Sequence, residues 1–194
     1  MNRRNFIKSL MAGSALGTGS LASHAAENLL DGTMRRPLTL LVQADLAPAH
    51  ALTSHLGAMF MSVGMRPSNA SVTGDQLRDI AALNGLLRRE GDGYLLGVMD
   101  TASAVIYEEL AAVRGTALVA RVNHRLGISE THHYCMAPGI TADIAWVEST
   151  GNRFDRLAQL YAGLLGYGDI APPSMPASVL PAVPTHLVSF LIET

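Results

Sequence analysis

Residues 94–113 read YLLGVMDTASAVIYEELAAV, and this stretch of the sequence decides the fold class. Its first six residues form a near-continuous apolar run, which is typical of a strand buried on both faces of a sheet. Asp100 or Thr101 can then cap a helix that continues to Val113. This order of strand, cap and helix is characteristic of α/β proteins, so the sequence predicts an α/β domain.

The sequence before this stretch repeats the pattern. Residues 38–44 are a β-prone run that suits another buried strand, and Pro48 is well placed at the start of a helix. Apolar residues recur at helical spacing from residue 49 to residue 65, so a helix is predicted there. We interpret residues 66–73 as a loop and residues 75–90 as a further helix.

The sequence after this stretch adds more strands. Residues 116–125 alternate in polarity, and residues 131–137 most simply return as the second strand of a hairpin. The predicted faces of the first of these strands are Leu118, Ala120, Val122 and His124 on one side and Arg121, Asn123 and Arg125 on the other. A further strand is expected within residues 140–147, a helix over 152–165 and a final strand over 187–192. Residues 38–194 should therefore form a single α/β domain with a mixed sheet of about five strands packed by about four helices.

The composition is that of a globular protein, because 48% of the 194 residues are hydrophobic and 15% are charged. These values exclude a disordered, collagen-like or disulfide-rich chain. The chain has 13 arginines and one lysine, Lys8. Schiff-base chemistry, pyridoxal-phosphate chemistry and a Walker-A phosphate loop all need a lysine, so removal of the N-terminal residues would exclude all three.

The N-terminal 25 residues have the features of a removable export signal. A basic segment that ends at Lys8 is followed by a mildly apolar stretch of about 13 residues and then by small residues suited to cleavage after Ala25. The apolar stretch is shorter than the roughly 20 residues that span a bilayer, so no permanent membrane span is expected. Residues 26–37 then form a polar linker.

Four residues of this signal carry a more specific resemblance. Arg3, Arg4, Phe6 and Lys8 stand in the run Arg-Arg-Asn-Phe-Ile-Lys, which closely resembles a twin-arginine signal, although Asn2 and Ile7 depart from the usual pattern. The alternative is an ordinary secretory signal that carries two arginines. The resemblance implies export to the periplasm in a folded state through the twin-arginine translocase, often with a cofactor inserted or a partner bound.

Cleavage would change the charge of the protein. Loss of Arg3, Arg4 and Lys8 leaves 11 basic residues against 16 acidic ones, a formal charge of −5. A mildly acidic protein has no electrostatic footprint for nucleic acid or for an anionic membrane surface, so we expect neither as a partner.

His124, His132, His133 and Cys135 form the densest group of potential metal ligands in the sequence. A hairpin turn around residues 128–129 would place His124 opposite His133, and would bring both to the same face as Cys135. Such a set could bind zinc or copper. A register shift of one residue would instead bring His132 opposite His124. The simpler alternative is that Cys135 is a small buried apolar residue and that the histidines satisfy backbone groups or face solvent.

A second set of potential metal ligands lies on the helix predicted over residues 49–65. Histidine and methionine side chains suit copper(I), but methionines on an apolar helix face more often fill a core. The residues concerned are His50, His55, Met59, Met61 and Met65.

Asp45 and Asp100 each follow a predicted buried strand. Because α/β sheets bind ligands beyond the carboxyl ends of their strands, the two carboxylates could line one crevice as acid/base groups or as ligand contacts. The alternative is that each simply caps the helix that follows it. After the signal, neither a Gly-x-Ser-x-Gly elbow nor a Gly-x-Gly-x-x-Gly loop occurs, so a serine hydrolase elbow and a dinucleotide site are not expected.

The sequence thus favours an exported periplasmic accessory or ligand-binding module that acts with another exported or membrane protein. The second hypothesis is a small metal-binding or redox enzyme centred on His124, His133 and Cys135.

Overall fold

A computed structural model of the chain describes residues 36–79, 81–83, 85, 92–138, 144–149, 154–167 and 185–194. These residues form an α/β structure built on one mixed sheet of seven strands. The strands are β1 (Leu38–Gln43), β2 (Ser68–Val72), β3 (Tyr94–Met99), β4 (Ala117–Leu126), β5 (Glu130–Met136), β6 (Ile144–Ser149) and β7 (Thr185–Glu193). The helices with described bounds are α2 (Ala47–Ser62), α3 (Gly74–Arg78), α5 (Thr101–Val113) and α6 (Asp155–Leu164). The export-signal residues Arg3, Arg4, Phe6 and Lys8 lie outside the described residues.

The strand order across the sheet is β2-β1-β3-β7-β4-β5-β6. The first three strands are parallel to one another, as expected for strands connected by helices. From β3 onward every pairing is antiparallel: β7 lies between β3 and β4 and runs against both of them, and β5 runs against both β4 and β6. The C-terminal strand of the chain therefore occupies the centre of the sheet, which explains why six consecutive residues of its nine, Leu187 to Ile192, are buried.

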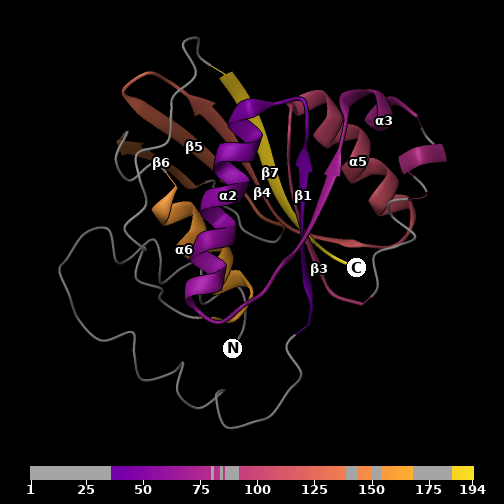
Figure 1. The fold of residues 1–194 in the computed structure, drawn as a ribbon, viewed down its shortest axis with the longest axis horizontal. Coiled ribbons are helices and arrows are strands. Elements are labelled where there is room, and N and C mark those ends of the chain that lie inside the picture. The colour runs from indigo at the N-terminus through magenta and orange to yellow at the C-terminus, as the bar shows by residue number, and fades with distance from the viewer. Residues whose placement is uncertain are drawn as a thin grey trace, which may run out of the picture.

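Helices cover both faces of the sheet and make a three-layer structure. Figure 1 shows α2 and α6 together on one side and α3 and α5 together on the other. Leu52, Leu56 and Phe60 of α2 pack with Leu157 and Leu160 of α6 in the first core. The second core lies under α5.

The helices that the structure describes cover β5 and β6 on one face only. Along each of these two strands, buried and exposed residues alternate strictly. The buried residues, such as Cys135 and Trp146, belong to the same core as α6. Among the described residues, no helix covers the other face of this end of the sheet, which lies beside α5, and we call this face the open face; the candidate ligand site described below lies on it.

The structure confirms the α/β class and the mixed sheet, but the expected count of about five strands was wrong. Residues 66–73, interpreted as a loop, contain the edge strand β2. This strand has the sequence SNASV, and an edge strand of this kind needs no apolar run because only Val72 is fully buried.

Two local predictions were also wrong. The helix predicted over residues 75–90 is interrupted, because the backbone of Asp79 is extended with φ −94° and ψ 106°. Residues 84 and 86–91 lie outside the described residues. Leu118 was expected on the same face as His124, but a register shift between Leu118 and Ala120 turns it toward the opposite core.

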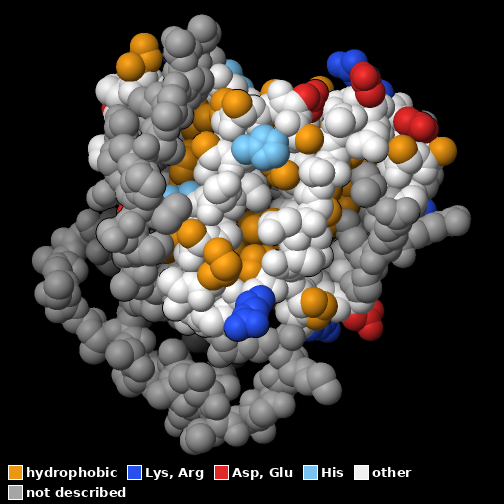
Figure 2. Space-filling view, viewed as in Figure 1, with side chains coloured by type: hydrophobic (Ala, Val, Ile, Leu, Met, Phe, Trp, Pro, Cys, Tyr) orange, Lys and Arg blue, Asp and Glu red, His pale blue; other side chains and the backbone are white. Residues whose placement is uncertain are grey.

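Charged side chains are few on the face of the protein that Figure 2 shows, among the residues that the structure describes, in keeping with a chain that is 15% charged. Among the helices of the described residues, none is both long enough and apolar enough to cross a membrane.

Candidate functional site

The predicted pairing of the two histidine-bearing strands is the observed one. His124 lies opposite His133 and Val122 lies opposite Cys135 in the β4–β5 hairpin. The side chains of His124, His133 and Cys135 all face the α6 side of the sheet and are buried. The structure therefore brings the three residues to one face, whereas His132 lies on the opposite, exposed face.

The two histidines belong to a continuous chain of hydrogen bonds inside the protein. The Nδ1 atoms of His124 and His133 are 2.8 Å apart. At one end, His124 Nε2 lies 2.7 Å from the hydroxyl of Ser189, which lies 2.6 Å from the hydroxyl of Tyr161. At the other end, His133 Nε2 lies 2.8 Å from Glu148 Oε2. We call Tyr161, Ser189, His124, His133 and Glu148 the buried polar chain; its members come from α6, β7, β4, β5 and β6.

One arrangement of protons satisfies every bond of the buried polar chain when Glu148 is ionised. His133 donates from Nε2 to the carboxylate, so its Nδ1 accepts the proton of His124 Nδ1. His124 Nε2 then accepts the Ser189 hydroxyl proton, and Ser189 accepts from Tyr161. Burial, together with the neighbouring His133, holds the pKa of His124 well below its usual range, which fits a neutral imidazole.

The Tyr161 phenol at the other end of the chain is also neutral. Burial raises the pKa of Tyr161 well above its usual range, and Cys135 and Glu108 act in the same direction against the hydrogen bond with Ser189. The phenol is therefore available as a proton donor to the buried polar chain.

Glu148 joins the buried polar chain to the beginning of α6. The N-cap residue of α6, Phe154, makes no side-chain capping bond. Instead, Glu148 Oε1 accepts a 2.7 Å hydrogen bond from the backbone N–H of Arg156 in the first turn. Trp146 Nε1 donates to the other carboxylate oxygen at 3.2 Å. A carboxylate at this end of a helix is favoured by the helix dipole, so Glu148 replaces the missing cap.

Trp146 is enclosed by two other groups of this region. The imidazole of His133 stacks on its ring with centroids 4.8 Å apart and an interplanar angle of 10°. The guanidinium carbon of Arg156 lies 5.6 Å from the centre of the Trp146 ring. The single tryptophan of the chain therefore reports directly on the surroundings of Glu148.

The buried polar chain contains a serine bonded to a histidine, but it does not present a nucleophile to a substrate. Ser189 and Tyr161 are each 0% exposed. All four ring nitrogens of His124 and His133 are already engaged in hydrogen bonds. Within the part of the chain that the structure describes, no three His, Cys, Asp or Glu side chains are arranged to hold a metal ion. The geometry therefore supports a structural role for this cluster.

Asp100 performs the capping role that the sequence offered as its alternative. Its carboxylate accepts the backbone N–H of Ser103 at 2.8 Å and the Ser103 hydroxyl at 3.0 Å, at the start of α5. Burial would raise the pKa of Asp100, but the hydrogen bonds from Ser103, Gln43 and Ala102 outweigh it and lower the pKa. Gln43 Oε1 in turn accepts the N–H of Asp100 at 3.0 Å and ties the ends of β1 and β3 together.

Asp45 does not cap the helix that follows it. The N-cap of α2 is Leu46, without a side-chain capping bond. The Asp45 carboxylate instead receives the backbone N–H of Gly74 at 3.2 Å, at the start of α3. Both aspartates lie at the carboxyl ends of neighbouring strands, as predicted, but the carboxylate of each accepts a backbone hydrogen bond at the start of a helix.

The methionine and histidine side chains of α2 point in different directions. Met59 is fully buried in the core, whereas Met61 is 61% exposed. His55 lies 2.9 Å from the Asp155 carboxylate, and His50 donates to the carbonyl of Ala44. The core-filling interpretation therefore fits Met59 and Met65, which are both buried, but not the exposed Met61.

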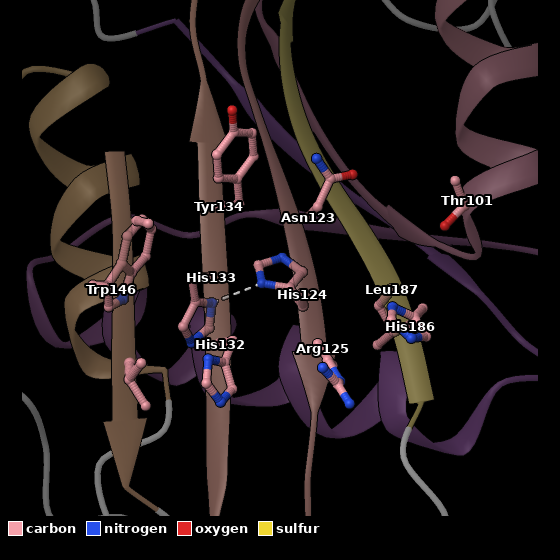
Figure 3. A pocket seen from close by; sticks show the side chains of 12 residues that line it. Thr101, Asn123, His124, Arg125, His132, His133, Tyr134, Trp146, His186 and Leu187 are labelled. Atoms are coloured by element: carbon pink, nitrogen blue, oxygen red, sulfur yellow. Dashed lines mark hydrogen bonds between the residues drawn. The ribbon is translucent and has the colours of Figure 1, made fainter. Parts of the chain in front are cut away.

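A hollow of about 550 Å³ lies on the open face of the sheet, and we refer to it as the hollow. It is lined by β4, β5, β6, β7 and the first residue of α5, Thr101. Figure 3 shows Arg125 between His132 and His186, with Asn123 and Tyr134 in the neighbouring row of the sheet. These side chains lie on the exposed face of the sheet. The buried polar chain lies on the opposite face of the same strands.

Sequence reasoning missed part of this region. Glu148 and Ser189 were not identified as candidates. Ser189 lies within a predicted strand, and Glu148 directly follows one. Arg125 and Asn123 were assigned correctly to the face opposite His124. The assignment of these two residues to that face was the sequence signal from which the hollow could have been found.

Comparisons of this chain with protein-family models, curated proteins and solved structures find no match. The function is therefore inferred from the residues themselves.

Proposed function

We propose that this chain is an exported periplasmic accessory protein that binds a small ligand in the hollow and acts with another exported or membrane protein. The observation that carries the proposal is a group of polar side chains that face the hollow without partners. Within the described ranges, the side chains of Arg125, Asn123, His186 and Thr101 make no hydrogen bond or ion pair.

The hollow has the properties of a ligand site. Its volume of about 550 Å³ lies in the range of small-molecule sites, roughly 300–1,000 Å³. A few polar groups of fixed position beside apolar and aromatic surface are what such sites use to orient a ligand. The buried polar chain supports the opposite side of β4, β5 and β7 and thereby holds these strands in register.

Export rests on the resemblance of Arg3, Arg4, Phe6 and Lys8 to a twin-arginine signal. We expect the periplasmic form to have lost the first 25 residues, which intact-mass measurement of the periplasmic fraction tests. Replacement of both arginines, Arg3→Lys with Arg4→Lys, should leave the chain in the cytoplasm. Export of this double variant at the wild-type level would contradict twin-arginine export.

Ligand binding is tested by filling the hollow. Ala145 lines the hollow and is exposed, so Ala145→Trp adds bulk there without disturbing the core. A ligand-observed NMR screen of small polar and aromatic compounds should give compounds that bind the wild-type protein and lose binding to this variant. Compounds that bind both proteins equally, or a screen without any binder, would contradict the proposal.

The alternative function, a metal or redox enzyme centred on His124, His133 and Cys135, has a separate test. It requires the two histidines to exchange their present hydrogen bonds for a metal ion. Elemental analysis of the protein purified from its own periplasm decides between the two, because stoichiometric zinc or copper would favour the alternative.

A further inference from the structure

Three basic side chains form a row across the open face of the sheet. Arg125 of β4 lies opposite His186 of β7 on one side and opposite His132 of β5 on the other. Neighbouring strands are about 4.8 Å apart, so the three side chains are close neighbours on one surface. A guanidinium flanked by two imidazoles presents several N–H groups on one surface, and these groups can donate hydrogen bonds to an anion.

Among the residues that the structure describes, the carboxylates on this face do not contact the middle of the row. His132, at one end, lies 2.7 Å from Glu130. Arg121, four residues before Arg125 on the same face of β4, is paired with Glu108 of α5 at 2.7 Å. Arg125 and His186 have no such partner among the residues that the structure describes. The guanidinium of Arg125 is therefore the fixed positive charge that remains open to a ligand.

Apolar surface adjoins this row on one side. Tyr134 is 40% exposed and Val147 is 53% exposed. Val147 lies opposite His132, and Ala145 lies opposite Tyr134, so these side chains continue the same face of the sheet toward β6. The hollow thus combines a cationic end with an aromatic and aliphatic end.

Neutral polar groups complete the cationic end. The Asn123 amide lies in the next row, between the Arg125 row and Arg121, and the Thr101 hydroxyl stands at the start of α5 (Figure 3). An amide and a hydroxyl both donate hydrogen bonds to an oxyanion. A planar guanidinium is suited to a carboxylate because it can donate two parallel hydrogen bonds to it.

We propose that the ligand of the hollow is a small organic carboxylate, with its oxygens on Arg125 between His186 and His132 and its apolar body over Tyr134, Ala145 and Val147. This inference rests on the proposed function, because it names the class of ligand for the same hollow. It excludes a neutral ligand and an inorganic anion as the preferred occupants.

The inference is tested with three probes and two arginine variants. Benzoate combines a carboxylate with an apolar ring, benzyl alcohol retains the ring without the charge, and inorganic phosphate retains negative charge without the ring. Binding of each probe is measured by NMR titration of the full-length protein. Arg125→Gln removes the charge in the hollow. Arg66→Gln is the matched control, because Arg66 is exposed and precedes β2 at the other edge of the sheet.

Benzoate should bind the wild-type protein more tightly than either of the other probes. Arg125→Gln should weaken benzoate binding about tenfold or more, whereas Arg66→Gln should leave it unchanged. Resonances of Asn123, Arg125, His132 and Tyr134 should shift during the titration. Unchanged benzoate affinity in Arg125→Gln, or tighter binding of phosphate than of benzoate, would overturn the carboxylate assignment.

The outcomes separate this inference from the proposed function. If benzyl alcohol shifts the resonances of the hollow as strongly as benzoate does, the ligand class is wrong but the ligand site remains. If every probe shifts only resonances away from the hollow, and the wider screen yields no compound sensitive to Ala145→Trp, then both proposals fail.

Discussion

Replacement of Glu148 by glutamine tests how the buried polar chain holds the sheet and α6 together. The carboxylate accepts three hydrogen bonds, from His133, Trp146 and the backbone of Arg156. Glutamine has the same shape but only one acceptor oxygen. If this oxygen faces His133 and Trp146, the Arg156 bond is lost, and if it faces Arg156, the other two are lost.

The magnitude follows from the smaller of these two losses. A hydrogen bond to a charged group contributes about 1.5–3 kcal/mol, and the amide NH₂ would in addition face an N–H donor. Removal of the buried charge offsets part of this cost. We therefore expect Glu148→Gln to lower the free energy of unfolding by about 2–3 kcal/mol and to lower Tm by roughly 4–12 °C.

Urea unfolding followed by tryptophan emission measures this effect, because the single tryptophan, Trp146, donates to Glu148. Glu109→Gln is the matched control, since Glu109 is exposed and its side chain has no partner among the described residues. The control should change stability by less than about 0.5 kcal/mol. A Glu148→Gln protein as stable as the control would refute the inferred role of Glu148.

Three further predictions concern the fold around the site. Asp100→Ala should lower the free energy of unfolding, measured in urea at pH 7, by about 1 kcal/mol. Asp100→Asn should lower it less, because asparagine keeps a capping oxygen. Because the pKa of Asp100 is lowered from 3.8, this stabilisation is present above about pH 3.8 and should disappear as the pH falls through the lower folded-state value. Gly97→Ala should cost about 1–3 kcal/mol, because a Cβ there would lie 2.2 Å from Cζ of Phe190, and Phe190→Leu in the same chain should recover part of the loss. Full additivity of these two changes in a double-mutant cycle would show that they do not interact. For His124, the folded-state pKa lies below the usual 6.5, so the unfolded chain binds more protons and stability should decrease as the pH falls below about 6.5. His124→Gln should reduce the slope of the unfolding free energy against pH by up to about 1.4 kcal/mol per pH unit. An unchanged slope would count against a buried neutral His124.

Local signals were sufficient for part of the fold. The strand Tyr94–Met99 and the helix Thr101–Val113 were predicted with their observed bounds, because the apolar run, the Asp100 cap and the turn after Val113 all agree. The pairing of His124 with His133 was also predictable, since a short turn determines the register of a hairpin.

Other features of the fold depend on interactions that local patterns do not contain. The last strand of the chain lies between β3 and β4, and nothing near residues 187–192 specifies those neighbours. The edge strand β2 has almost no apolar pattern. Leu118 changes face through a bulge, which period-2 alternation does not anticipate.

The candidate site was likewise predictable from the sequence only in part. The group of His124, His133 and Cys135 was found from the sequence, but the chemistry around it depends on Ser189, which is 65 residues from His124, and on Glu148 of the next strand. Arg125 was correctly placed on the opposite face. That this face is open depends on where α5 packs, which only the three-dimensional arrangement shows.

The most direct test of the central proposal, a ligand site in the hollow, is a crystal structure of the protein soaked with 4-bromobenzoate. Anomalous scattering locates the bromine without reference to any other feature of the map. We predict a bromine peak over Tyr134 and Val147, with the carboxylate on the guanidinium of Arg125. A bromine peak only at other positions, with an empty hollow that solvent can reach in the crystal, would contradict the proposal.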